Sequence, residues 1–210
     1  MNAASLPEWL EHIERLHPKT IALGLDRVQQ VRRALALDPS FPVITVGGTN
    51  GKGSVCAMLE AILDLAGYRV GCYTSPHLLR YNERVRIGRL EAGDADLARA
   101  FAAVEQARQA VPLTYFEMGT LAAMWLFLQQ RVEAAVLEVG LGGRLDAVNV
   151  FDADCAIVTT VDIDHVDFLG GDREAIGYEK AGIFRGGRRA VCADPAPPAS
   201  LTQHAGAIGA

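Results

Sequence analysis

The amino-acid sequence predicts an α/β fold in which helices flank a mostly parallel sheet. Three observations support this prediction. Short apolar segments alternate with longer segments of helical periodicity along most of the chain. One apolar segment runs directly into a glycine-rich turn, and an amphipathic helical pattern follows that turn. The 210 residues, half of them hydrophobic, are enough for one substantial core.

Composition and charge narrow the class of protein. The net charge is −5 and no segment is dominated by Lys and Arg, which argues against a nucleic-acid partner. No apolar run is long enough to span a membrane, and Glu8, Glu11 and Glu14 exclude a signal peptide. The four cysteines form no CxxC pair, which predicts free thiols and no zinc. We expect a cytoplasmic protein that binds neither membranes nor nucleic acid.

Residues 1–40 are expected to form N-terminal helices and an apolar loop that pack on the main domain. Helical spacing of apolar residues predicts helices at residues 7–16 and 27–37. The apolar loop between them, residues 21–25, either packs in the core or forms the wall of a pocket for a flat organic ligand. The residues alone favour core packing.

Residues 43–54 have the pattern of a strand, a phosphate-binding loop and the start of a helix. The glycines allow backbone N–H groups to approach phosphate oxygens, and the positive end of the helix dipole adds to this attraction. Lys52 would neutralise the outer phosphates, and the hydroxyl of Ser54 would serve as a ligand of Mg²⁺. The pattern therefore indicates a loop that binds phosphate groups.

The loop departs from the standard phosphate-loop pattern in two ways. Three residues separate Gly47 from Gly51 where four are usual, and Gly53 separates Lys52 from the hydroxyl residue. A simple glycine turn is therefore the alternative. The helix after the loop is expected to run from Val55 to about Ala66.

The remaining elements follow from the same apolar patterns. Strands are predicted at residues 69–74, 84–87, 134–139, 155–161 and 189–193, and helices at 94–110, 114–130 and 174–184. Residues 194–198 are typical of an extended linker. Residues 201–210 contain no feature that would end a domain.

Polar residues at strand ends mark the candidate site, because ligands of open parallel sheets gather at the carboxyl ends of the strands. Ser75 follows one predicted strand, and Glu138 lies near the end of an otherwise apolar strand. A carboxylate in such a strand needs a metal or a basic partner, since burying it unpaired is costly. Glu138 is therefore either a magnesium ligand or the ion-pair partner of Arg144.

An acidic segment and a lysine could each belong to a functional site or have only a structural role. Asp162, Asp164, His165 and Asp167 follow the strand at residues 155–161 and form either a cation site or a solvated acidic loop. Lys180 lies beside an apolar patch, where a lysine usually extends its ammonium group to solvent.

With these residues identified, the chain closely resembles the bacterial folate-pathway ligases, the bifunctional dihydrofolate synthases and folylpolyglutamate synthases, which are relatives of the Mur peptide ligases. The shortened phosphate loop is itself the form found in this family. The resemblance covers nearly the whole chain and rests on five segments in the family's order: Gly48–Ser54, Thr74–Leu78, Leu137–Asp146, Asp164-His165 with Leu169-Gly170, and Glu179–Phe184.

The resemblance implies a fold and a set of site residues. The fold would be the central ATPase domain of the Mur ligases, of the P-loop NTPase type and truncated, with residues 41–210 forming it. The nucleotide phosphates would be bound by Gly48, Thr49, Asn50, Gly51, Lys52, Gly53 and Ser54. The magnesium ligands would be Ser54, Ser75, Glu138 and His165, and Lys180 would be carbamylated. The pterin substrate would contact Leu16, His17, Thr114, Tyr115, Phe116, Glu117, Leu145, Asp146 and Ala147, with the loop at residues 21–25 as its wall.

Two positions differ from the family pattern and bear on substrate preference. Ala22 stands where Asp is common, and Val166 follows His165 where Thr is usual.

The resemblance also implies an activity, with ATP and Mg²⁺ as cofactors. ATP would phosphorylate the carboxylate of dihydropteroate or of a folate's terminal glutamate, and the amine of L-glutamate would attack the acyl phosphate. Family members are roughly twice as long, so we expect the C-terminal glutamate ligase domain to be absent, the ATPase domain to be incomplete and this fragment alone to be inactive. The full-length protein is expected to be a monomer. The alternatives are another Mur-type carboxylate-amine ligase and a non-catalytic nucleotide-binding module.

Overall fold

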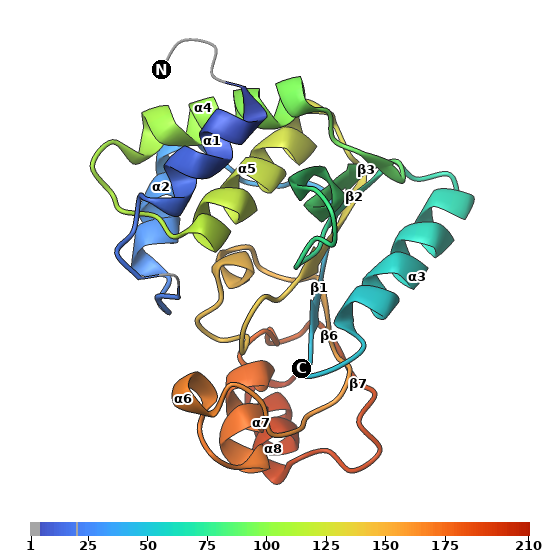
Figure 1. Cartoon of the computed structure of the whole chain (residues 1–210). Coiled ribbons are helices and arrows are strands. Elements are labelled where there is room, and N and C mark those ends of the chain that lie inside the picture. Colours follow the sequence, from blue (N-terminus) through green and yellow to red (C-terminus); the bar gives the residue numbers. More distant parts are fainter. Residues whose placement is uncertain (1–4, 20) are drawn as a thin grey trace.

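A seven-stranded, mostly parallel sheet forms the centre of the molecule, and helices flank it (Figure 1). The computed structural model describes residues 5–19 and 21–210, so residues 1–4 and 20 of the expected N-terminal region lie outside the described residues. The strand order is β4-β3-β2-β5-β1-β6-β7. The strands are β1 (Val43–Gly47), β2 (Val70–Tyr73), β3 (Val85–Ile87), β4 (Leu90–Glu91), β5 (Ala134–Glu138), β6 (Cys155–Val158) and β7 (Arg189–Cys192). The predicted α/β fold is confirmed.

Strand direction places the chemically important segments at one edge of the sheet. The strands β2, β5, β1, β6 and β7 are parallel, whereas β3 and β4 form an antiparallel edge next to β2. In register, Val46 of β1 lies beside Glu138 of β5, and Gly47 lies beside Val158 of β6. The carboxyl ends of the three central strands therefore meet at one place.

The helices are distributed unevenly over the sheet. Figure 1 shows α1 (Leu6–Glu14), α2 (Asp26–Ala34), α4 (Asp94–Arg108) and α5 (Tyr115–Gln129) grouped on one side, and α3 (Lys52–Leu65) on the other. Both α1 and α2 pack on α4 and α5, so the N-terminal helices join the body of the domain. The helices α6 (Val166–Leu169), α7 (Arg173–Ala181) and α8 (Ala199–Ile208) lie at the β7 end of the sheet, and two short 3-10 helices are η1 (Tyr81–Arg84) and η2 (Ala147–Val150).

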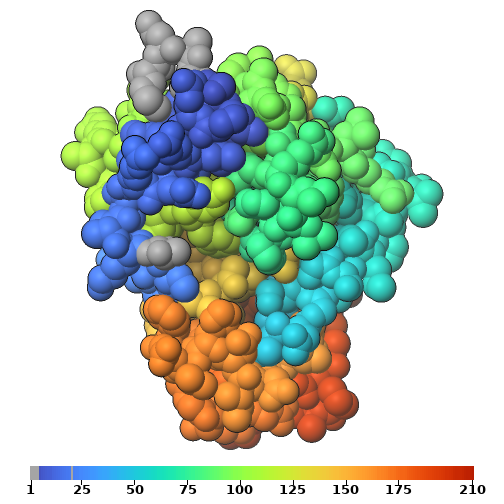
Figure 2. All heavy atoms as spheres, in the orientation of Figure 1, coloured from blue at the N-terminus to red at the C-terminus, as the bar shows by residue number. Residues whose placement is uncertain are grey.

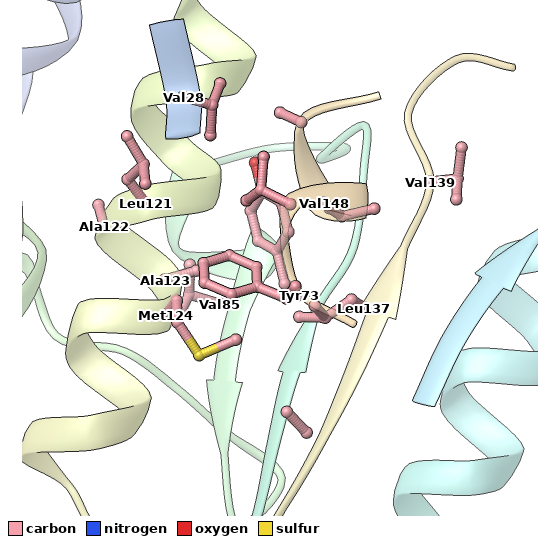
Figure 3. Close-up of a cluster of buried hydrophobic side chains, with 14 of the residues drawn as sticks. Val28, Tyr73, Val85, Leu121, Ala122, Ala123, Met124, Leu137, Val139 and Val148 are labelled. Carbon is pink, nitrogen blue, oxygen red and sulfur yellow. The ribbon is translucent and has the colours of Figure 1, made fainter. Parts of the chain in front are cut away.

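The main core lies between the sheet and α5. Figure 3 shows Tyr73 and Leu137 from the strands facing Met124 of α5, and all three side chains are buried. The helix approaches β2 so closely that a Cβ atom on Gly71 would lie 2.7 Å from the ring of Phe127. A smaller core of five buried residues lies under α3.

Two local features differ from what the sequence indicated. The helix after the phosphate loop begins at Lys52 and not at Val55, because Gly51 adopts a left-handed conformation (φ 83°) and completes the turn just before Lys52. Residues 201–210 lie largely in α8, a helix that the sequence did not suggest; left-handed Gly209 (φ 69°) ends it. Several other elements end up to three residues from their predicted limits, as is usual for element boundaries.

The four cysteines are free thiols, and Cys56 and Cys72 are buried. Within residues 5–19 and 21–210, no helix combines the length and apolar character that crossing a membrane requires.

Candidate functional site

The phosphate-binding loop connects β1 to α3 at the carboxyl end of the central strand, and contacts with the segment after β6 hold its shape. The Thr49 N–H donates to Thr160 O at 2.8 Å, and the Thr159 hydroxyl donates to Asn50 O at 2.6 Å. Gly48 has a φ of 143°, and a Cβ atom there would fall 1.8 Å from Thr159 Oγ1. Only glycine fits this position.

The lysine of the loop lies over its backbone. Lys52 Nζ donates to Gly48 O at 2.9 Å and to Thr49 O at 3.2 Å. Gly53 and Ser54 are exposed in the first turn of α3. The structure thus brings together the predicted nucleotide-binding residues, Gly48 to Ser54, around one helix N-terminus.

Glu138 is buried beside the start of α3, with only 4% of its surface exposed. Its Oε2 accepts a hydrogen bond from the Ser75 N–H at 3.0 Å, and a Cβ atom on Gly53 would lie 3.9 Å from both carboxylate oxygens. Burial raises the pKa of Glu138, while the Ser75 N–H and the charge of Lys52 act in the opposite direction. The alternative pairing with Arg144 is wrong, because Arg144 binds Glu179 at 2.7 Å.

The predicted magnesium residues fit that ion in chemical type. Ser54 and Ser75 offer hydroxyl oxygens, Glu138 offers a carboxylate and His165 offers an imidazole nitrogen. Mg²⁺ prefers oxygen ligands, which three of these four residues provide. Glu138 has one hydrogen-bond donor in the described part of the chain, which leaves acceptor capacity on a buried carboxylate. His165 precedes α6 in a left-handed conformation (φ 49°) and lines the same cavity as Lys52 and Ser75.

The acidic side chains after β6 are spread along their loop. Across residues 5–19 and 21–210, no three His, Cys, Asp or Glu side chains are grouped so that they could hold a metal ion. Asp162 and Asp167 are exposed, and Asp164 is half-buried with Oδ2 at 3.7 Å from His165 Nε2. The structure therefore brings Asp164 and His165 together but does not group all four residues.

Lys180 is buried in α7, with 3% of its surface exposed, so the expectation that its ammonium group extends into solvent was wrong. Burial lowers its pKa to about 8, and the positive charge of Lys52 acts in the same direction. A larger fraction of Lys180 is therefore neutral near physiological pH than for an ordinary lysine.

A cavity of about 370 Å³ opens beside the phosphate loop. Lys52, Ser75 and His165 line it, together with an apolar wall that includes Phe116 and residues 21–23. Both interpretations of the 21–25 loop hold in part, since its first three residues line this cavity and Leu25 packs against the main core. In Figure 2, gold atoms of the segment after β5 are visible between the blue N-terminal region and the orange segment after β6.

Asp146 and Glu117 are buried carboxylates of this cavity, each with 3% of its surface exposed. The Asp146 oxygens accept hydrogen bonds from the Leu141 N–H at 2.8 Å and the Val148 N–H at 3.0 Å. Burial raises the pKa of Asp146 to about 7 although these N–H groups favour the ionised form. Each oxygen keeps a second lone pair that can accept from a ligand.

The nine predicted pterin residues do not all meet in one place. Six of them line the cavity next to the phosphate loop: Thr114, Phe116, Glu117, Leu145, Asp146 and Ala147. His17 and Tyr115 line a neighbouring cavity of about 600 Å³, and Phe116 borders both. Leu16 packs against the main core.

Two arginines at these cavities were missed by the sequence interpretation. Arg84 lines both cavities, and Arg27 donates to Glu117 Oε1 at 2.8 Å and to Ala22 O at 2.7 Å. The only signal for Arg84 was its place at the start of an alternating strand next to the Ser75 segment. No sequence signal linked Arg27 to Glu117.

The chain matches the family model described as the Mur ligase middle domain over residues 46–195. It is 52% identical to the dihydrofolate synthase/folylpolyglutamate synthase of Escherichia coli (strain K12), over 99% of this chain and 50% of that protein. It is 38% identical to the folylpolyglutamate synthase of Lacticaseibacillus casei, over 75% of this chain and 38% of that protein. The chain spans about half the length of the curated relatives it matches.

Solved structures agree with this relationship. E. coli FolC in complex with DHPP and ADP superposes with a TM-score of 0.97 and 52% identity, over 99% of this chain and 50% of that chain. A bifunctional folylpolyglutamate synthase/dihydrofolate synthase with Mn, AMPPNP and L-glutamate bound gives a TM-score of 0.93 at 51% identity, over 99% of this chain and 50% of that chain. The expected resemblance is confirmed, and the chain belongs to the Mur ligase middle-domain family.

Proposed function

We propose that the protein containing this chain is an ATP-dependent ligase that adds L-glutamate to dihydropteroate and to folate (poly)glutamates through an acyl-phosphate intermediate. The observation that carries the proposal is a single cavity that has the phosphate-loop lysine, Lys52, at its border and a buried carboxylate, Asp146, in its apolar wall. Such a cavity would hold an organic carboxylate next to a nucleotide phosphate.

The wall of the cavity suits a flat, polar heterocycle. Phe116 and Leu145 supply apolar surface, and Asp146 supplies an acceptor for ring N–H groups. Relatives support the same assignment, since FolC has been solved with DHPP and ADP together. The six lining residues from the predicted set, with the loop at residues 21–23, are our proposed pterin site.

The chain's own groups would act mainly by position and charge. Lys52 and the loop N–H groups would bind the phosphates and stabilise charge on the transferred phosphoryl group. Ser54, Ser75, Glu138 and His165 would hold Mg²⁺, which supplies further charge neutralisation when bound. No side chain is needed as a nucleophile.

Lys180 is proposed to be carbamylated. Carbamate formation requires a neutral amine, and the lowered pKa of Lys180 provides one. The modification would turn a buried cation near Lys52 into an anion that can pair with that lysine or with a metal.

We also propose the domain organisation and setting. Residues 1–40 would contribute the substrate wall, residues 41–210 would form part of the ATPase domain, and a C-terminal glutamate ligase domain would complete the enzyme. The full-length protein would be a cytoplasmic monomer whose partners are ATP, L-glutamate and dihydropteroate or folate, with no nucleic acid or membrane.

Calorimetric titration of the chain with Mg-ATP and separately with pteroate tests the proposal, with Lys52→Ala as the variant. We expect both ligands to bind the wild type and only nucleotide binding to be lost in the variant. We expect little glutamate addition by the chain itself, and substantial turnover would contradict that part of the proposal. Pteroate binding separates this function from another Mur-type ligase, and failure of pteroate to bind the wild type would contradict it.

A non-catalytic nucleotide-binding module makes a different prediction. In such a module, nucleotide affinity would not depend on the metal residues Glu138 and His165. Unchanged magnesium-dependent ATP binding in both Glu138→Ala and His165→Ala would therefore favour the module.

A further inference from the structure

Arg84 lies at the junction of two cavities. Its side chain lines the 370 Å³ cavity beside the phosphate loop and also the 600 Å³ cavity that contains His17, Lys19, His77 and Tyr115. Phe116 is the other residue that borders both. A ligand that extends from the first cavity into the second must therefore pass Arg84.

The guanidinium group of Arg84 is held in place but has no acidic partner. Its Nε donates to His77 Nδ1 at 2.8 Å, and its Cζ lies 5.5 Å from the ring centre of Tyr81 and 5.4 Å from that of Tyr115. In the described part of the chain, no carboxylate lies within 4.0 Å of its nitrogen atoms.

The other charged groups of these cavities do not neutralise the positive charge of Arg84. In the first cavity, the Glu117 carboxylate is bound by Arg27 and the Asp146 carboxylate by two backbone N–H groups. In the second cavity, Glu14 is the acidic residue, and the ammonium group of Lys19 in the same lining offsets its charge. The junction is therefore electropositive.

A guanidinium group fixed beside two adjoining aromatic rings presents a flat pair of N–H donors, which matches the geometry of a carboxylate. Because Arg84 is only partly exposed, an anion that it binds there is screened less by water than at an open surface. The chemistry of the junction thus favours a carboxylate ligand.

We infer that Arg84 binds the non-reacting α-carboxylate of the first glutamyl residue of a folate substrate. This inference rests on the proposed function. Dihydropteroate has one carboxylate, which must lie near Lys52 to react. A folate carries in addition an α-carboxylate that never reacts and that needs a partner along the cavity wall. The second cavity provides room for the rest of the longer molecule. Arg84 is accordingly a specificity residue that separates substrates with a glutamyl tail from those without one.

The test compares pteroate with pteroylglutamate, which differ only by the glutamyl residue. Titration calorimetry would measure both affinities for the wild-type chain and for Arg84→Gln. We expect the affinity for pteroylglutamate to fall about 10- to 100-fold, the usual effect of losing a hydrogen bond between charged groups. The affinity for pteroate should fall less than the affinity for pteroylglutamate, because pteroate lacks the glutamyl α-carboxylate, and the ratio of the two losses is the readout. Arg84→Lys should lose part of the pteroylglutamate affinity, since lysine keeps the positive charge but lacks the flat pair of N–H donors.

Matched controls make the outcomes distinct. Arg99→Gln removes an exposed arginine of α4 that lines neither cavity, and both affinities should be unchanged. Unchanged Mg-ATP binding by Arg84→Gln shows that the variant is folded, since Arg84 makes no contact with the phosphate loop. If Arg84→Gln lowers the affinities for both ligands by the same factor, or lowers neither affinity, the inference is overturned while the proposed function stands. If the wild type binds neither ligand, the proposed function itself fails.

Discussion

The guanidinium group of Arg27 in α2 donates a hydrogen bond to the carboxylate of Glu117 at the start of α5, with 2.8 Å between Nη2 and Oε1. The same nitrogen donates to Ala22 O at 2.7 Å. Glu117 also accepts from the Thr114 N–H at 2.7 Å as part of the helix cap. One arginine thus joins the apolar loop to the wall of the proposed pterin site.

Arg27→Ala should therefore release the loop and weaken pteroate binding, about 10-fold for the loss of a bond between charged groups. Binding of Mg-ATP should not change, because the phosphate loop contacts neither residue. Calorimetry with each ligand checks this. Arg33→Ala is the matched control, since Arg33 is an exposed arginine of the same helix. Equal pteroate affinity in both variants would show that Arg27 does not position the loop.

Glu138→Gln should separate stability from function. Burial raises the pKa of Glu138, so the neutral amide should keep or increase the free energy of unfolding at neutral pH. The amide is a poor ligand for Mg²⁺, so magnesium-dependent affinity for ATP should fall at least about 10-fold. Urea unfolding and calorimetry with and without Mg²⁺ measure the two effects. A destabilised variant with unchanged Mg-ATP affinity would assign Glu138 to structure alone.

Carbamylation of Lys180 should depend on pH at fixed dissolved CO₂. Because burial lowers the pKa of Lys180 to about 8, the neutral amine that reacts with CO₂ increases as the pH rises through that value. NMR with ¹³C-labelled CO₂ should show a carbamate signal that grows across this range and is absent in Lys180→Arg. A signal that persists in Lys180→Arg would belong to another amine.

Titration of Asp146 should lower the free energy of unfolding as the pH rises. The unfolded carboxyl ionises near its ordinary value of 3.8, whereas burial raises the folded pKa to about 7. Between these values the unfolded state loses the proton first, so the stability contributed by this group is present below 3.8 and is lost by about pH 7.

Asp146→Asn lacks this titration. Its free energy of unfolding, measured by urea unfolding in small pH steps, should therefore improve relative to wild type as the pH rises and then level off above the folded pKa. The absolute stability of the variant should be lower at acid pH, because an amide has one acceptor for the Leu141 and Val148 N–H groups. Parallel curves for the two proteins would contradict the raised pKa.

The features predicted correctly from sequence are those in which local patterns agree with the fold. Apolar strands that end in glycine or polar residues indicated where β1, β2 and β5 finish, and hence where the site lies. Glu138 was identified because a carboxylate conflicts with its apolar strand. In contrast, α8 was missed because five residues rich in proline precede it and its apolar pattern is weak.

Long-range polar pairing accounts for most of what the sequence could not predict. Glu117 is 90 residues away from Arg27, and an arginine in a polar helix looks solvated until the fold supplies its partner. Arg84 is similar, because only the meeting of two cavities distinguishes it from a surface arginine. For the apolar loop at residues 21–25 the difficulty was different. A segment that packs in the core and a segment that lines a pocket have the same composition, so the residues alone could not show that this loop does both.

The hydrogen bonds between the phosphate loop and the segment after β6 affect the kinetics of nucleotide binding. Hydrogen bonds from Thr49, Asn50 and Thr159 already fix the backbone, so little conformational entropy remains to be lost when phosphates arrive. Lys52 need only exchange two carbonyl partners for phosphate oxygens, which is a side-chain motion on the nanosecond scale. Nucleotide should therefore associate at a rate limited by diffusion and orientation, and differences in affinity among phosphate-loop variants should lie in how fast it leaves.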